Sequence, residues 1–158
     1  AVRELECELS RENSEYLFVT AFIAVLDLIT GEMTYVCAGH DAPVLQRAEA
    51  LLRVDTAPIS GPPLCAAGDF PYLAGRMQLL RGDRLYLFTD GVTEASNGVE
   101  MFGMGRLQMA IENCAQAELQ AVTTMLRDTV RQFEAGQPPA DDLTLLLIQW
   151  HGPVLSER

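Results

Sequence analysis

An apolar run leads directly into an acidic corner in the stretch Leu85-Tyr86-Leu87-Phe88-Thr89-Asp90-Gly91-Val92-Thr93-Glu94-Ala95. The alternating aliphatic and aromatic residues predict a buried strand, and the Thr-Asp-Gly sequence predicts a turn at its end. The carboxylate of Asp90 is therefore expected at the end of a rigid element, where a metal ligand would be held in place.

A second acidic segment precedes the last apolar run, in Asp141-Asp142-Leu143-Thr144-Leu145-Leu146-Leu147-Ile148. If the two strands are neighbours, the carboxylates of Asp90 and Asp141 converge at one rim of a sheet. Each motif alone is more typical of a turn or a helix stop. In a chain of net charge -11, however, grouped carboxylates repel each other unless a cation holds them. Hard oxygen ligands favour Mg²⁺ or Mn²⁺, which hold phosphate oxygens and activate water.

Length and composition indicate one ordinary globular domain. The 158 residues are 49% hydrophobic and 21% charged, so we expect a single domain over residues 1–158 that ends in a polar tail at 151–158. The acidic balance argues against a nucleic-acid partner. No apolar run is long enough to cross a bilayer, and the cytoplasm is the expected location.

The pattern of apolar residues predicts an α+β fold with mostly antiparallel strands. Hairpins are expected from 17–27 with 33–38, from 44–46 with 51–54, and from 72–80 with 84–89; helices are expected over 1–13, 107–114 and 119–133, before a last strand that ends at 150. Both strands of the first hairpin are apolar on both faces, so this hairpin is expected at the centre of a covered sheet. Residues 55–70 are expected to form a long irregular connection.

Other chemistries find little support. The widely spaced cysteines (Cys7, Cys37, Cys65 and Cys114) are interpreted as buried apolar thiols. His40 could donate a proton to a leaving group, but a loop residue that bonds its own backbone is the better interpretation. No phosphate-binding Gly-x-x-x-x-Gly-Lys loop, Gly-x-Ser-x-Gly elbow or His-Glu-x-x-His motif is present.

A series of motifs resembles the stage II sporulation protein E-like (SpoIIE-like) bacterial phosphatases, a branch of the metal-dependent type 2C (PPM) serine/threonine phosphatases. The resemblance covers 17–149 and rests on 18–22, 27–31, 35–43, 82–85, 88–95 and 141–145. It implies a β-sandwich flanked by helices, with two Mg²⁺ or Mn²⁺ ions in the intact domain. Asp90 and Asp141 would be catalytic metal ligands, with Gly91 and Asp142 as less certain members of the metal site.

The resemblance also implies partners. The substrate would be a phosphoserine or phosphothreonine regulator, in this branch a STAS-type anti-anti-sigma protein, and an upstream sensor or receiver domain would control the activity. The family supplies further ligands from Asp-x-Gly-Asp and Asp-Val-x-Gly-His-Gly segments, and neither occurs in these residues. We therefore expect an N-terminally truncated domain with weak or no activity alone. Missing strands would expose sheet edges, which favours a homodimer.

Two alternatives to an enzyme remain open at this point. The same fold could be a non-catalytic module that binds a STAS domain or a kinase-like anti-sigma factor. The acids could also be turn residues in an unrelated α+β protein.

Overall fold

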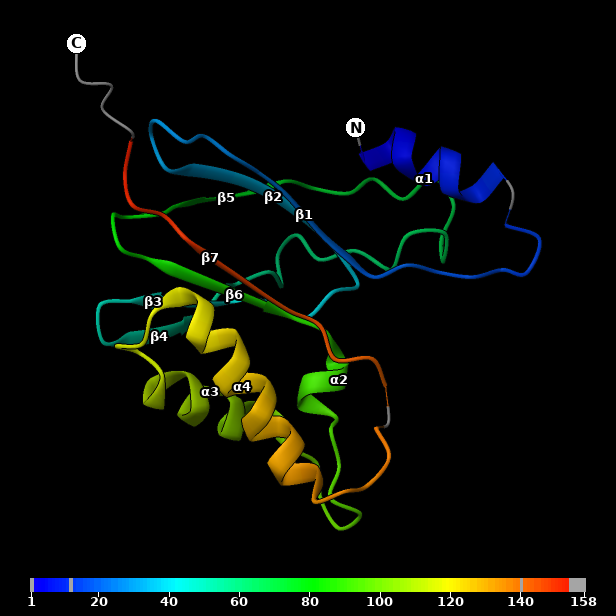
Figure 1. Cartoon of the computed structure of the whole chain (residues 1–158). Coiled ribbons are helices and arrows are strands. Elements are labelled where there is room, and N and C mark those ends of the chain that lie inside the picture. The colour runs from blue at the N-terminus through cyan, green and yellow to red at the C-terminus, as the bar shows by residue number, and fades with distance from the viewer. Residues whose placement is uncertain (1, 12, 140, 154–158) are drawn as a thin grey trace. The chain divides into compact units, whose positions relative to one another are not determined.

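The computed structural model describes residues 2–11, 13–139 and 141–153 (Figure 1). Helices and strands alternate irregularly along the chain. They are α1 (Val2–Arg11), β1 (Ala21–Leu26), β2 (Glu32–Ala38), β3 (Val44–Arg47), β4 (Ala50–Arg53), β5 (Gly75–Gln78), β6 (Arg84–Phe88), α2 (Asp90–Thr93), α3 (Gly103–Asn113), α4 (Leu119–Glu134) and β7 (Leu145–Gln149). All strand pairs of the two sheets are antiparallel, which confirms the α+β class. No helix among the described residues is both long and apolar enough to span a membrane.

The elements belong to two compact units, which are described separately. The first consists of Ala1–Ala42, Asp55–Arg81 and His151–Arg158, and the second of Pro43–Val54 and Gly82–Trp150. The extent of a single phosphatase domain over 1–158 stays a prediction.

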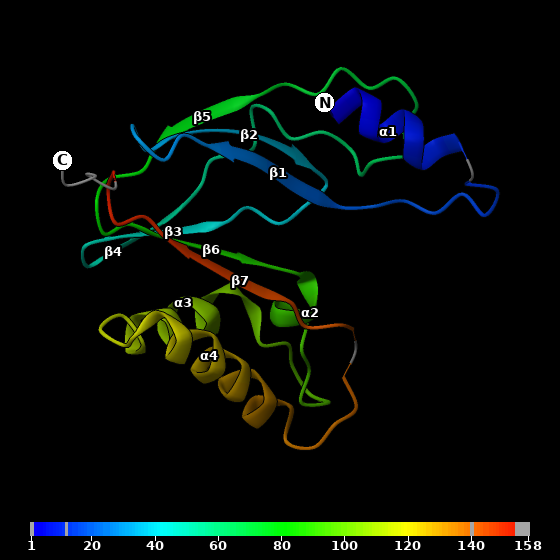
Figure 2. The ribbon, with the colours of Figure 1, turned by 45° about the horizontal axis from the view of Figure 1, so that its top comes forward.

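The first unit contains a three-stranded sheet in the order β1-β2-β5 (Figure 2). β1 and β2 form the predicted hairpin, with Ala21 opposite Ala38 and Leu26 opposite Met33. Asp27 shapes the turn between them, because its Oδ1 accepts hydrogen bonds from the backbone N–H groups of Ile29 and Thr30. These bonds, that of Thr30 first, lower the pKa of the Asp27 carboxyl below its ordinary value.

The expectation that this hairpin lies at the centre of a covered sheet is wrong for β1. β2 is the middle strand, whereas β1 lies at an edge of the sheet and its Val25 side chain is 73% exposed. Apolar residues on both faces normally indicate burial on both faces. In β1 the same pattern instead leaves apolar side chains in contact with solvent.

The second unit contains a four-stranded sheet in the order β4-β3-β6-β7. Helices α3 and α4 lie on the same side of this sheet (Figures 1 and 2), and both were predicted from their apolar spacing. The hydrophobic core of this unit, to which both the sheet and the helices contribute, contains Val44, Tyr86, Phe88, Val92, Ala95, Phe102, Leu107, Ala110, Ile111, Cys114, Val122, Leu126 and Val130. Helix α4 ends at Glu134, and its cap Ala135 adopts the left-handed conformation just before Gly136.

The predicted hairpin of 72–80 with 84–89 does not form. β5 pairs with β2 in the first unit, whereas β6 pairs with β3 and β7 in the second. The tripeptide Arg81-Gly82-Asp83 is thus a connection between the units rather than a hairpin turn. A local turn motif could not show this, because the strands that pair with β5 and β6, namely β2 and β7, lie in distant parts of the sequence.

The predicted N-terminal helix is present as α1, but its buried residue is not an apolar one. Glu6 is only 4% exposed, while Leu5 and Leu9 are 42% and 39% exposed. The expectation of four buried thiols is also only half right. Cys37 and Cys114 are buried, whereas Cys7 is exposed and Cys65 is half-buried.

Two polar contacts stabilise the sheet of the second unit. Arg47 in β3 donates to both carboxylate oxygens of Asp83, at 2.6 to 3.2 Å. The Tyr86 hydroxyl donates to Oε1 of Gln46 at 2.7 Å, and burial raises the pKa of Tyr86 above its ordinary value. Both pairs link β3 to β6 or to the residue just before it. They therefore hold in place the strand that ends at Asp90.

Candidate metal centre

Strand β6 delivers Asp90 to the rim of the sheet of the second unit. Phe88 at the end of the strand is 2% exposed, and Asp90 is exposed as the first residue of the short helix α2. The predicted corner is therefore a single helical turn rather than a simple β-turn. Buried Gly91 and Val92 anchor this turn, so the acidic side chain projects from a fixed backbone.

Strand β7 brings the second acidic segment to the same rim. β6 and β7 pair antiparallel, with Phe88 opposite Leu145, as the convergence of the two motifs requires. Beyond the strands, the Thr89 hydroxyl donates to the carbonyl oxygen of Asp142 at 2.9 Å and accepts from the N–H of Thr144 at 3.0 Å. This side chain ties the two acidic segments together through their backbones.

Gly91 makes the closest approach between the segments. A Cβ atom placed on this residue would collide with the backbone carbonyl of Asp142. The sequence interpretation named Gly91 only as a possible member of the metal site and did not assign Thr89 a role. The glycine of the Thr-Asp-Gly motif could have indicated this contact, because glycine is needed where two backbone segments approach each other closely.

The carboxylates of this rim are held by local backbone bonds. Oδ1 of Asp90 accepts from the N–H of Gly91 at 3.0 Å, and Oδ1 of Asp141 accepts from the N–H of Asp142 at 2.7 Å. Asp90, Asp141 and Asp142 are all exposed, which leaves carboxylate oxygens accessible. Their ligand role stays a prediction.

These donors fit a hard divalent cation in type but not in number. Carboxylate oxygens are the ligands that Mg²⁺ and Mn²⁺ prefer, and both ions are bound by more donors than two carboxylates can provide. Within the described ranges 2–11, 13–139 and 141–153, no group of three or more His, Cys, Asp or Glu side chains could hold a metal ion. A tight site would therefore need additional ligands.

The other candidates have structural roles. Nδ1 of His40 lies 2.8 Å from the backbone oxygen of Asp41, which agrees with the interpretation of a loop residue bonded to its own backbone. Cys37 contacts the carbonyl oxygen of His40 through its thiol. Neither residue belongs to the unit that contains Asp90.

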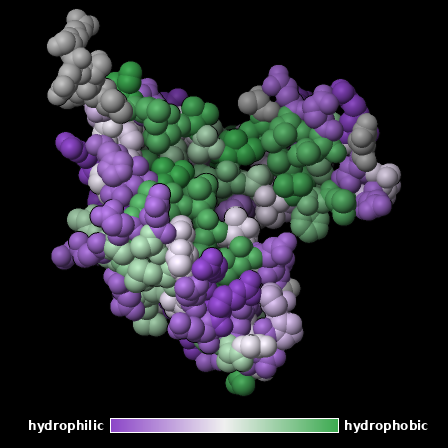
Figure 3. Space-filling view, viewed as in Figure 1, coloured by the Kyte–Doolittle hydropathy of each residue, from purple (hydrophilic) through white to green (hydrophobic). Residues whose placement is uncertain are grey.

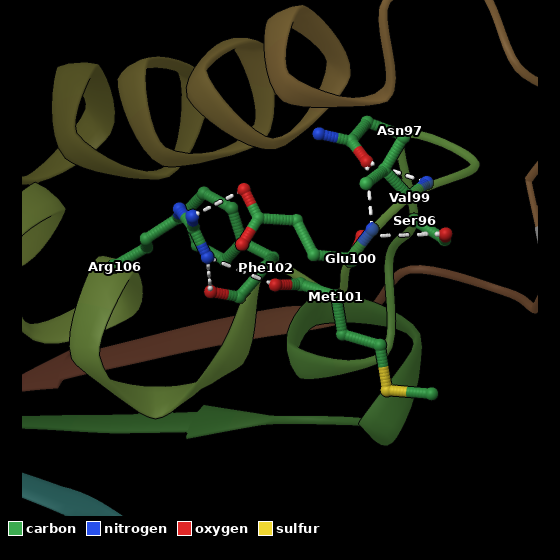
Figure 4. A network of polar contacts seen from close by, with 7 residues as sticks. All are labelled: Ser96, Asn97, Val99, Glu100, Met101, Phe102 and Arg106. Atoms are coloured by element: carbon green, nitrogen blue, oxygen red, sulfur yellow. Dashed lines mark hydrogen bonds and ion pairs between the residues drawn. The ribbon is translucent and has the colours of Figure 1, made fainter.

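The loop between α2 and α3 is closed by a network of polar contacts (Figure 4). Oδ1 of Asn97 accepts from the N–H groups of Val99 and Glu100, both at 2.9 Å. Arg106 closes the loop, because it donates to Oε1 of Glu100 and to the carbonyl oxygens of Met101 and Phe102. The loop is thus closed at its base by a cation from α3.

Comparisons with known proteins connect this geometry to a family. The chain is 24% identical over 151 residues to Protein IcfG of Synechocystis, a match that covers 94% of this chain and 23% of that protein. It thus spans about a quarter of this curated relative. Its fold matches the phosphatase domain of the cell fate determinant SpoIIE from Bacillus subtilis, with a TM-score of 0.72 and 17% identity over 99% of this chain and 67% of the other.

A further solved structure has the same fold. The RsbU and RsbW domains of Rv1364c from Mycobacterium tuberculosis match with a TM-score of 0.72 and 24% identity, over 94% of this chain and 40% of theirs. The family model described as "Stage II sporulation protein E (SpoIIE)" matches residues 1–151. Because that match includes nearly the whole sequence together with both acidic segments, the chain belongs to the stage II sporulation protein E (SpoIIE) family.

Proposed function

We propose that this chain forms part of a metal-dependent protein serine/threonine phosphatase, with Asp90 and Asp141 as its divalent-cation ligands. The observation that carries the proposal is the contact between the two acidic segments, in which Thr89 bonds to both Asp142 and Thr144. Family membership supports the reaction class. The match to other proteins of known fold supports the architecture.

The chain's own residues would position the cation and the phosphate. Bound Mg²⁺ or Mn²⁺, two ions in the intact domain, would acidify a water molecule and neutralise charge on a phosphate. The backbone bond to Gly91 fixes the carboxylate of Asp90, so the free oxygen keeps its orientation. The backbone of Asp142 packs against Gly91, and its exposed carboxylate adds negative charge to the segment, which favours a cation.

The substrate is proposed to be a phosphorylated protein, in this family a STAS-type anti-anti-sigma factor. An upstream sensor or receiver domain is the proposed control element, and the cytoplasm is the proposed location. The absence of a nucleic-acid partner also stays a proposal, which the net charge of -11 supports. Because the chain spans 23% of its curated relative, these partners are proposed for the parent protein.

A non-catalytic partner-binding module is the second candidate. The described residues contain no group of three or more metal-binding side chains, and this observation favours the alternative. The family match excludes the third interpretation, in which the acids belong to an unrelated protein.

The decisive experiment is Mn²⁺-dependent release of phosphate from a phosphoserine peptide by this chain. For an active chain, we expect Asp90→Asn and Asp141→Asn each to abolish the metal-dependent rate. If the chain is inactive, calorimetric titration with Mn²⁺ separates the two candidates. Binding that both variants lose supports an incomplete catalytic site, whereas the absence of binding supports the partner-binding module.

Asp90→Asn is expected to weaken Mn²⁺ binding by about tenfold or more, since a cation site depends on the charge of its ligands. The unfolding midpoint should not change, because the Asp90 side chain is exposed. Asp128→Asn is the matched control, because it removes an exposed carboxylate of α4 that pairs with Arg127 instead. Loss of the fold in Asp90→Asn, or equal weakening in both variants, would contradict a ligand role.

A further inference from the structure

The loop between α2 and α3 contains an asparagine followed by a glycine, Asn97-Gly98. An antiparallel bridge between Ser96 and Met101 closes this loop. The backbone N–H of Asn97 also donates to the carbonyl oxygen of Glu100 at 3.2 Å. In such a dipeptide the backbone nitrogen of the glycine can attack the side-chain amide of the asparagine, because no Cβ atom obstructs the approach. Whether the fold favours this attack depends on how it holds the two reacting groups.

The side-chain carbonyl of Asn97 lies between two hydrogen-bond donors. Its Oδ1 accepts from the backbone N–H groups of Val99 and Glu100, both at 2.9 Å (Figure 4). Enzymes use the same arrangement, two backbone N–H groups on one oxygen, to stabilise the negative charge that forms when a carbonyl carbon is attacked. Attack on Cγ of Asn97 would create this charge on Oδ1, where both donors already point.

The attacking group would be the backbone nitrogen of Gly98. Its N–H donates to Oγ of Ser96 at 3.1 Å, and the same hydroxyl donates to the carbonyl oxygen of Glu100 at 3.3 Å. Gly98 belongs to no helix or strand, and it is exposed. Figure 3 shows hydrophilic, purple surface over α4, which lies next to this loop in Figures 1 and 2. Water therefore reaches the nitrogen, and no regular secondary structure has to open first.

The chain has two other asparagines, and the fold constrains both of them. Asn113 ends α3, and the N–H of the following Cys114 is bonded to carbonyl oxygens of the preceding helical turn. The amide of Asn13 is held at both ends, because Nδ2 donates to the carbonyl oxygen of Leu17 at 2.6 Å and Oδ1 accepts from its N–H at 2.7 Å. Both are followed by a residue that has a Cβ atom. They are internal comparators for Asn97.

We propose that Asn97 is a site of spontaneous deamidation, with water as the co-reactant. Hydroxide removes the proton from the Gly98 nitrogen, which attacks Cγ of Asn97 and forms a new C–N bond. The bond from Cγ to Nδ2 then breaks, and the side-chain nitrogen takes up a proton from water and leaves as ammonia. Water opens the resulting cyclic imide at one of its two carbonyl groups. The products are aspartate or isoaspartate at position 97 and one molecule of ammonia.

The two products have different effects on the loop. Aspartate keeps an acceptor for the N–H groups of Val99 and Glu100, and its charge strengthens both bonds. Isoaspartate routes the backbone through the former side chain, so the acceptor no longer lies where these N–H groups point. A Cβ atom placed on Gly98 would lie 3.4 Å from Nε2 of Gln137, in the segment that leads to Asp141. The isoaspartate form should therefore loosen the contact between the loop and that segment. The reaction itself does not depend on the metal site.

The test is peptide mapping by mass spectrometry of the purified chain during incubation at neutral and at mildly alkaline pH. Asn97 is expected to gain the mass of an amide-to-acid conversion about tenfold faster, or more, than Asn13 and Asn113 in the same sample. The rate should rise with pH, because the attacking nitrogen must lose its proton. Isoaspartate is recognised by its separate elution, and Asn97→Gln should remove both products.

The same measurement on the chain unfolded in guanidinium chloride separates the effect of the fold from that of the dipeptide. We expect the native rate at Asn97 to equal or exceed the unfolded rate, because only the native loop places two donors on Oδ1. At Asn13 and Asn113 the native rate should be the lower one, since the fold holds the amide or the following N–H.

Two results would overturn the proposal. One is a native rate at Asn97 that does not exceed the rates at Asn13 and Asn113. The other is a native rate at Asn97 below the rate in the unfolded chain, which would show that the loop protects the amide instead of activating it.

Discussion

Arg47→Met is expected to lower the free energy of unfolding by about 3–5 kcal/mol, since it leaves a buried carboxylate without its cation. Asp83 is 2% exposed, and Arg47 donates to both of its oxygens. The backbone carbonyl of Asp83 also accepts a hydrogen bond from the N–H of Trp150, which holds this residue at the end of the sheet. Urea denaturation followed by circular dichroism would measure this loss.

Removing the other partner should cost less. Arg47 is 36% exposed, so in Asp83→Leu its guanidinium can reach water. The double variant Arg47→Met/Asp83→Leu should recover part of the stability lost in Arg47→Met, because replacing both members of a buried pair is often nearly neutral. If the effects of the two substitutions simply add, the pair is not coupled and the prediction fails.

Gly91→Ala is expected to lower the free energy of unfolding by about 2–3 kcal/mol, the usual cost of inserting an atom into a packed site. The new methyl group would meet the backbone of Asp142, which a side-chain rotation cannot relieve. The bonds from Thr89 to the β7 segment should weaken as well, so the variant should also lose Mn²⁺ affinity. Calorimetry and urea denaturation report these two effects separately.

Gly105→Ala is the matched control for this substitution. Gly105 lies in α3, and a Cβ atom there meets nothing within 4 Å. Gly105 lies in the first turn of this helix, so alanine should raise the free energy of unfolding by at most about 0.5–1 kcal/mol, the full gain in a helix interior. Equal stability changes of both variants would show that the approach of Gly91 to Asp142 does not carry the predicted strain.

The sequence was most informative where the pattern is local. Regular apolar spacing predicted α3 and α4, and two apolar runs close together in the sequence predicted the β1–β2 hairpin. The pairing of β6 with β7 followed only from the chemistry of their acidic ends. It could not be read from periodicity, because the strands lie more than fifty residues apart, as the bond from Thr89 to Asp142 shows.

Long-range competition explains the errors. β5 and β6 are neighbours in sequence, yet each pairs with a distant strand, and no turn motif shows this choice. The burial of Glu6 and the exposure of Val25 depend on what packs over them, which the residues themselves do not determine. Thr89 and Gly91 were missed as backbone contacts for the same reason, since their importance comes from a segment that follows much later.

The position of β6 between β3 and β7 also has a consequence for synthesis on the ribosome. Domains fold as the chain emerges from its N-terminal side, and contacts between distant residues form slowly. β3 is available as soon as β6 is made, but β7 is translated after α3 and α4. Asp90 therefore leaves the ribosome well before Asp142 can be placed against Gly91, so the nascent chain cannot assemble the acidic rim until translation has passed β7.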